Sequence, residues 1–167
     1  MTAYDSSRRI MRIGELRSQS RLFIEKIDLQ SAESALREAV ELAKPGGSVD
    51  DNLLWAKTME DLASLLYRAS RRNLAEVYDL YQASLMLHEG TNRANRSDIA
   101  LLYEKLSAVH DTARRPLDAA DCLVRALKIW EASPDQSLAS PARLDDLRQR
   151  ANYFYRAGGA NKTANLI

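Results

Sequence analysis

Two histidines and one cysteine are the residues of this chain best suited to metal binding, acid–base catalysis or nucleophilic attack. They are His88, His110 and Cys122, and no two of them stand at the three- or four-residue spacing that places two ligands on one face of a helix. A zinc site of ordinary composition therefore cannot be drawn. We expect His110 to be a core histidine with one local hydrogen bond. Cys122 is expected to be a small buried or half-buried residue, since a single cysteine cannot form an internal disulfide.

Paired acids could serve in general acid–base catalysis, and paired glycines could form a phosphate-binding loop. Asp50-Asp51 and Asp145-Asp146 lie where helices are expected to start, and there the helix dipole favours negative charge. Gly46-Gly47 and Gly158-Gly159 each end an expected helix, and neither is followed by a Lys-Ser or Lys-Thr pair. We therefore predict no catalytic residue, no metal and no cofactor, and hence a protein that is not an enzyme. An enzyme of unfamiliar design stays open as an alternative.

Composition favours one folded domain spanning residues 1–167. The chain is 46% apolar and 28% charged, which suits a continuous core. Its net charge of +1 gives no bulk electrostatic attraction to nucleic acid or anionic lipid, so we expect neither as a partner. No apolar run approaches the ~20 residues of a membrane span, and the start, MTAYDSSRR, has no signal-peptide core. These features predict a cytoplasmic protein without membrane insertion.

The elements that would position these side chains recur every 44 residues. Residues of similar size fall in the same column of this repeat: Leu22, Leu66, His110 and Phe154; Ala69, Ala113 and Ala157; Leu36, Leu80 and Val124; Ala39, Ala83 and Leu127; Leu42, Met86 and Trp130. Each copy holds two stretches with apolar residues at three- and four-residue steps, which is typical of two amphipathic helices. A repeat of this length with two helices predicts a helical solenoid, in which each pair buries its apolar face by stacking on its neighbours.

Helix start and stop signals give the expected bounds. The repeats run over about 6–45, 50–90 and 97–132, and a terminal helix follows at 141–157. The starts are marked by Ser48 with Asp51, Asn73 with Glu76, Ser97, Pro116, and Ser140 with Pro141, and the stops by Pro45 to Gly47, Gly90 and Gly158. The first helix is expected from about Ser6 to Ile27 and the second from Leu29 to Lys44. The remaining ANKTANLI could form a turn or two of an eighth helix.

The segment LASLLYRASRRNLAEVYDLYQASLMLHEG resembles the tetratricopeptide repeats, specifically the longer version found in kinesin light chains and many bacterial proteins. RPLDAADCLVRALKIWE repeats the second half of that pattern. Gln19, Ser107 and His110 depart from it, and the period exceeds the usual ~34 residues, so a HEAT-like repeat stays open. The resemblance implies an all-α right-handed superhelix of about seven helices in antiparallel pairs. It further implies a scaffold that binds a protein or peptide segment in a concave groove.

If the resemblance holds, the first helix of each pair lines that groove, one or two steps off its buried stripe. The residues so selected are Lys57, Glu60, Ser64, Tyr67 and Arg68; Leu101, Glu104, Ala108 and Asp111; Arg148, Asn152, Tyr155 and Arg156; and, on the first helix, Ile13, Leu16 and Phe23. Acids in the middle of this set favour a partner segment with a central basic residue. The alternative is an ordinary solvated face. Tyr67→Ala and Glu104→Lys should each weaken partner binding and leave the melting temperature within a few degrees, because neither side chain is assigned to the core.

Two further surfaces could bind partners. Tyr153, Phe154 and Tyr155 on the terminal helix predict a homodimer through that helix, unless ANKTANLI folds back to cover Phe154. Arginines on the first helix could form a docking patch, although a solvated helix face is the simpler interpretation: Arg8, Arg9, Arg12 and Arg17. Besides a scaffold, the sequence leaves open a peptide-sensing regulator or a chaperone-type protein that acts through a partner.

Overall fold

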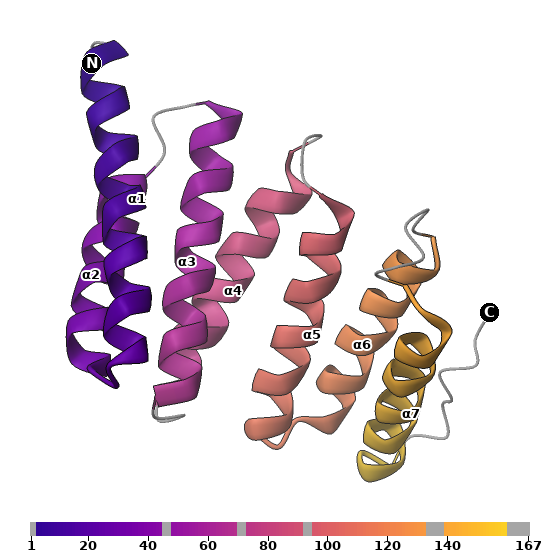
Figure 1. Cartoon of the computed structure of the whole chain (residues 1–167). Helices are drawn as coiled ribbons and strands as arrows, with labels where there is room; N and C mark the ends of the chain where they lie inside the picture. Colours follow the sequence, from indigo (N-terminus) through magenta and orange to yellow (C-terminus); the bar gives the residue numbers. More distant parts are fainter. Residues whose placement is uncertain (1–2, 45–47, 70–72, 92–94, 133–138, 160–167) are drawn as a thin grey trace. The chain divides into compact units, whose positions relative to one another are not determined.

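The computed structural model of the chain describes residues 3–44, 48–69, 73–91, 95–132 and 139–159. Every regular element in these ranges is an α-helix, which confirms the predicted all-α class. Figure 1 shows the helices in chain order: α1 (Ala3–Glu25), α2 (Leu29–Ala43), α3 (Val49–Ala69), α4 (Leu74–Glu89), α5 (Arg96–Thr112), α6 (Pro116–Glu131) and α7 (Pro141–Ala157).

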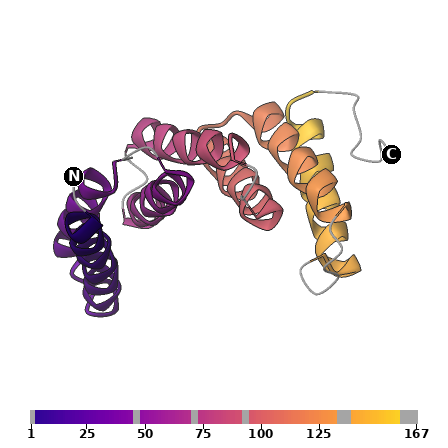
Figure 2. The same ribbon diagram turned by 90° about the horizontal axis from the view of Figure 1, so that it is seen from above.

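The helices fall into two compact units, residues 1–93 and 94–167. In the first unit α1 packs on α2, α2 on α3, and α3 on α4; in the second, α5 packs on α6 and α6 on α7. The helices that are consecutive within a unit therefore form sequential antiparallel pairs, as predicted, and the second view shows the same pairing (Figure 2). The superhelical path and the single domain over 1–167 stay predictions.

Most helix starts and stops are those that the sequence predicts. The Ser48 hydroxyl accepts a hydrogen bond from the Asp51 N–H at 3.0 Å, and the Asn73 side chain accepts one from the Glu76 N–H at 3.4 Å. Pro116 occupies the first turn of α6, where its missing N–H leaves no hydrogen bond unmade. Ser140 is the N-cap of α7, and its side chain accepts a hydrogen bond from the Arg143 N–H. Gly90 ends α4 and Gly158 ends α7.

The predicted cap of α5 is wrong. Asn95, not Ser97, begins this helix: its side-chain oxygen accepts a hydrogen bond from the Ser97 N–H at 3.1 Å. Asn and Ser are about equally good N-caps, so the sequence alone did not decide between them. Among the other expectations, those on Pro45 to Gly47 and on ANKTANLI lie outside the described residues.

Helix α1 ends at Glu25 rather than at Ile27, through a Schellman motif. The Asp28 N–H donates to the Phe23 carbonyl at 2.9 Å and the Ile27 N–H to the Ile24 carbonyl at 3.0 Å. This motif requires a left-handed residue after the helix, usually glycine, and here that residue is Ile27 with φ 63°. The turn after α5 repeats the motif with Arg114 at φ 58°. After α7 the corresponding residue is Gly159, at φ 72°.

The core of the first pair consists of small and branched apolar side chains. Ile13 and Leu16 of α1 pack with three alanines of α2, and Leu42, Leu54 and Trp55 lie against this cluster: Ala35, Ala39 and Ala43. Because alanine carries only a Cβ, it allows the helix axes to approach closely. In the second pair, Ala63 is fully buried, as the sequence predicts.

Candidate functional site

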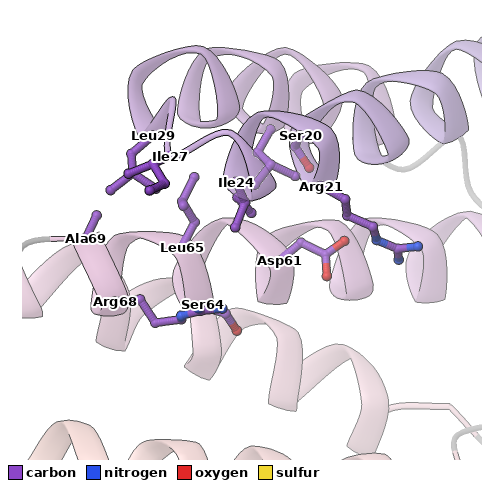
Figure 3. A pocket seen from close by; sticks show the side chains of 11 residues that line it. Ser20, Arg21, Ile24, Ile27, Leu29, Asp61, Ser64, Leu65, Arg68 and Ala69 are labelled. Atoms are coloured by element: carbon purple, nitrogen blue, oxygen red, sulfur yellow. The ribbon is translucent and has the colours of Figure 1, made fainter.

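A pocket of about 360 Å³ lies in the first unit between the C-terminal halves of α1 and α3 (Figure 3). Its volume is in the range of sites that hold a ligand group. The lining comes from α1, from the turn after it, from α2 and from α3: Ser20, Arg21, Ile24, Ile27, Leu29, Leu36, Asp61, Ser64, Leu65, Arg68 and Ala69. We take this pocket as the candidate site.

The two walls of the pocket are equivalent faces of successive repeats. Ser20 and Ser64 stand 44 residues apart, and so do Ile24 and Arg68. Arg17 and Asp61 have the same separation, and the Arg17 guanidinium donates to the Asp61 carboxylate at 2.7 Å. This ion pair joins α1 to α3 beside the pocket, so it fixes the spacing of the two walls.

Apolar side chains form the floor. Leu36 is 1% exposed and Leu65 is 5% exposed, so both are fixed by packing. In Figure 3, Leu65 points from α3 towards Ile24 and Leu29. Burying an apolar group of a ligand against this floor would remove water from both surfaces and favour binding.

A hydrogen bond orients the polar edge of the α3 wall. The Ser64 hydroxyl lies 2.9 Å from the Tyr81 hydroxyl of α4. Burial, the largest cause, raises the pKa of Tyr81 to about 12, so its phenol stays protonated and available for this bond. Ser64 is therefore held by the helix pair rather than left to rotate freely.

The charges at the mouth of the pocket are predominantly positive. Arg21 and Arg68 are exposed, and neither has a hydrogen bond or ion pair with the described part of the chain. The single acid among the lining residues, Asp61, is already bonded to Arg17. A guanidinium binds carboxylates in a planar, two-pronged geometry, so this mouth suits a negatively charged ligand group.

Of the predicted groove residues, Ser64 and Arg68 line this pocket and the others do not. Glu60 instead accepts hydrogen bonds within its own helix pair, from the Ser84 hydroxyl at 3.0 Å and from His88 Nε2 at 3.1 Å. His88 is 1% exposed, and its Nδ1 has no hydrogen-bond partner among the residues that the structure describes. Through its hydrogen bonds to Ser84 and His88, Glu60 links α3 to α4.

Glu104 has the same place in the next repeat and a similar role. Its Oε1 accepts hydrogen bonds from Trp130 Nε1 at 2.8 Å and from Arg143 Nη2 at 2.7 Å. The Arg143 guanidinium also stacks over the Trp130 ring, 4.5 Å from its centroid. Glu104 therefore joins α5, α6 and α7. The expectation that Glu104→Lys would leave the melting temperature within a few degrees took this side chain to lie outside the core, whereas the structure builds it into the packing.

The terminal helix shows the same internal use of predicted groove residues. The Tyr155 hydroxyl donates to the Asp121 carboxylate of α6 at 2.8 Å, and Tyr155 is buried. Arg148 pairs with Glu131 of α6. Arg156 is exposed and Asn152 is half-buried.

The remaining predicted residues divide by exposure. Lys57, Leu101 and Asp111 are exposed, and Tyr67 and Ala108 are half-buried. Their part in binding stays a prediction. On α1 the predicted register is wrong: Ile13 and Leu16 belong to the core, and Phe23 is half-buried. The error arose because spacing shows which residues share a face and not which face a neighbouring helix covers.

The arginines of α1 are used in ion pairs rather than displayed as a patch. Arg9 pairs with Asp51, and its guanidinium also donates to the Lys44 carbonyl. Arg12 pairs with Glu38 at 3.0 Å. Arg17 pairs with Asp61 as described, and Arg8 also has a partner. These pairs tie α1 to α2 and α3 and leave little free positive charge for docking.

The homodimer through α7 stays a prediction, and most of the aromatic surface that suggested it is covered. Phe154 and Tyr155 are 8% and 6% exposed, so both are already covered within the second unit. Tyr153 is 67% exposed, and its ring lies edge-on to Phe154 with centroids 5.5 Å apart. Any self-association through this helix would therefore depend on Tyr153.

His110 and Cys122, two of the residues suited by type to metal binding or catalysis, lie in packed surroundings. Burial lowers the pKa of His110, which is 6% exposed, and raises the pKa of Cys122 to about 11, so that thiol stays protonated and unreactive. The described side chains form no group of three or more His, Cys, Asp or Glu that could hold a metal ion. None of the helices in the described ranges is long and apolar enough to cross a bilayer.

Antiparallel helix pairs that recur every 44 residues define a helical-repeat fold. Among solved structures, the chain is similar to BtubC (BKLC) from P. vanneervenii, a bacterial kinesin light chain with tetratricopeptide repeats. The identity is 17%, the TM-score is 0.55, and the match covers 95% of this chain and 85% of that chain. This match confirms the predicted resemblance at the level of the fold. No protein-family model matches the sequence, and no curated protein is detectably similar to it.

Proposed function

We propose that this chain is a non-enzymatic scaffold that binds a segment of a partner protein in the pocket between α1 and α3. The observation that carries the proposal is a pocket lined both by buried apolar side chains and by Arg21 and Arg68, neither of which pairs with a residue that the structure describes. Support also comes from the fold, since stacked helix pairs form extended surfaces for binding other proteins. In this proposal the chain acts in the cytoplasm, as its sequence predicts.

The pocket chemistry specifies one kind of segment. An aliphatic or aromatic side chain would fill the space over Leu65 and Leu36, and full burial of such a group contributes about 1.5–3 kcal/mol. A neighbouring carboxylate would meet Arg21 or Arg68 at the mouth. Part of this gain is offset by ordering the segment, so the expected affinity is that of a transient complex.

This chemistry reverses the charge that the sequence predicts for the partner. The expectation of a central basic residue rested on Glu60, Glu104 and Asp111. The carboxylates of Glu60 and Glu104 accept hydrogen bonds from side chains of their own unit, and Asp111 does not line the pocket. Among the residues that line the pocket, Arg21 and Arg68 are the charged side chains without an ion pair to a described residue. We therefore propose an acidic segment.

A selection from a random library of twelve-residue peptides displayed on phage tests the proposal. The immobilised chain should enrich peptides in which an apolar residue stands within two positions of Asp or Glu. The best peptide, synthesised with a fluorescent label, then gives a dissociation constant by fluorescence polarisation. Reversing both charges with Arg21→Glu and Arg68→Glu should weaken its binding about tenfold or more.

Arg114→Glu is the matched control, because Arg114 is also exposed but lies in the second unit. It should leave the dissociation constant unchanged. Enrichment of peptides with basic residues, or equal binding by the doubly reversed variant, would contradict the proposed site.

A further inference from the structure

Ile27 occupies a backbone conformation that its side chain disfavours. Its φ is 63°, in the left-handed region that glycine adopts freely. The methyl and ethyl branches at Cβ make isoleucine one of the residues least suited to this region. The Schellman motif at the end of α1 forces the conformation, so the chain has placed a strained residue where glycine would be relaxed.

The fold gains nothing visible from this side chain. Ile27 is 82% exposed, so it contributes little to the core. At the equivalent place after α7 the chain has Gly159, which removes the strain. After α5 the residue is Arg114, whose exposed charged side chain keeps the turn polar. An exposed aliphatic side chain in this conformation therefore has no structural explanation within the first unit.

The position of Ile27 supplies a reason. It lines the edge of the pocket between α1 and α3, and Figure 3 shows it beside Leu29, with Ile24 on the same wall. An apolar group that enters the pocket would pass this edge. Contact with Ile27 would then remove from water a side chain that the unbound chain leaves exposed.

We propose that Ile27 is a partner-contacting residue, kept in a strained conformation so that its side chain covers the apolar group of the bound acidic segment. The inference rests on the proposed function and adds a residue that helps determine specificity. It predicts that stability and binding respond in opposite directions at this position. A residue that served only the fold would not show this behaviour.

The test compares Ile27→Gly with Arg114→Gly in the full-length chain. Both substitutions relieve a left-handed residue at the same place of the same motif, so both should raise the melting temperature, by about 2–4 °C. The dissociation constant of the phage-selected peptide should rise about five- to tenfold in Ile27→Gly, since part of an apolar contact is lost. It should stay unchanged in Arg114→Gly. Ile27→Leu should retain binding within about twofold.

Each other result contradicts the inference. If Ile27→Gly lowers the melting temperature, the fold uses the side chain after all. If it raises the melting temperature but leaves binding unchanged, Ile27 does not contact the partner, while the effect of reversing Arg21 and Arg68 still reports on the pocket. Unchanged binding on that reversal would instead remove the proposed function itself.

Discussion

Glu60 and Glu104 show how one residue of the repeat holds a helix pair together. Both stand on the first helix of a pair and accept hydrogen bonds from the second helix. The donors differ in the two copies, a serine and a histidine in one and a tryptophan in the other. A carboxylate with several acceptor positions accommodates either set.

Removing the carboxylate of Glu104 should destabilise the second unit. Glu104→Ala leaves the indole N–H of the buried Trp130 without its acceptor and releases Arg143. An orphaned buried donor costs about 1–3 kcal/mol, so urea unfolding followed by circular dichroism should show a loss of this size. Asp145→Ala is the control: Asp145 is 71% exposed in its ion pair with Arg148, and its loss should change stability by less than about 0.5 kcal/mol. Equal effects of the two substitutions would contradict this role.

The helices depend on local signals at their ends. Asp28, Ser48, Asn73 and Ser140 each accept a backbone hydrogen bond at the start of a helix. These bonds satisfy N–H groups that have no acceptor within the helix. The bounds are therefore readable from the sequence, except where two capping residues lie close together.

Helix α5 is that exception, and two alanine substitutions show whether Asn95 or Ser97 caps it. Asn95→Ala should destabilise the protein by about 1 kcal/mol, because its side chain accepts the Ser97 N–H. Ser97→Ala should change the free energy of unfolding by less than about 0.5 kcal/mol, since Ser97 lies within the first turn. Unfolding of both variants in urea gives the comparison. A larger loss for Ser97→Ala would restore the cap that the sequence predicts.

At the scale of the whole molecule, one face of α1 is more exposed than the equivalent face of α3. Glu15 and Ser18 are exposed, whereas Met59 and Leu62, which follow them by 44 residues, are buried. Met11 is 65% exposed, whereas its equivalent Trp55 is partly buried against the core cluster of α1 and α2. Polar residues at positions that are apolar in the other copies are typical of a capping repeat.

The whole pocket belongs to the first compact unit, which leads to a prediction about its independence. A fragment of residues 1–93 should remain helical by circular dichroism and bind the selected peptide within about threefold of the full chain, because repeat units are stabilised by near neighbours. The fragment 94–167 should not bind it. A folded 1–93 fragment that binds more than about tenfold more weakly would place essential contacts in the second unit.

The sequence alone determined the helices and their pairing. Apolar spacing, caps and the repeat are local properties, so the bounds of α2, α6 and α7 followed from residues such as Pro116 and Ser140. The acids that it placed in the groove were Glu60, Glu104 and Asp111, because each lies one or two steps off a buried stripe.

Only the tertiary structure decided which exposed face is free for a partner. Whether a carboxylate forms hydrogen bonds with a neighbouring helix depends on residues some 24 to 39 positions away. Ser84 is such a residue for Glu60, and Arg143 for Glu104. The strain at Ile27 likewise depends on φ, which the residue type does not fix. The pocket between α1 and α3 thus emerged from packing, because it joins side chains that no local pattern connects.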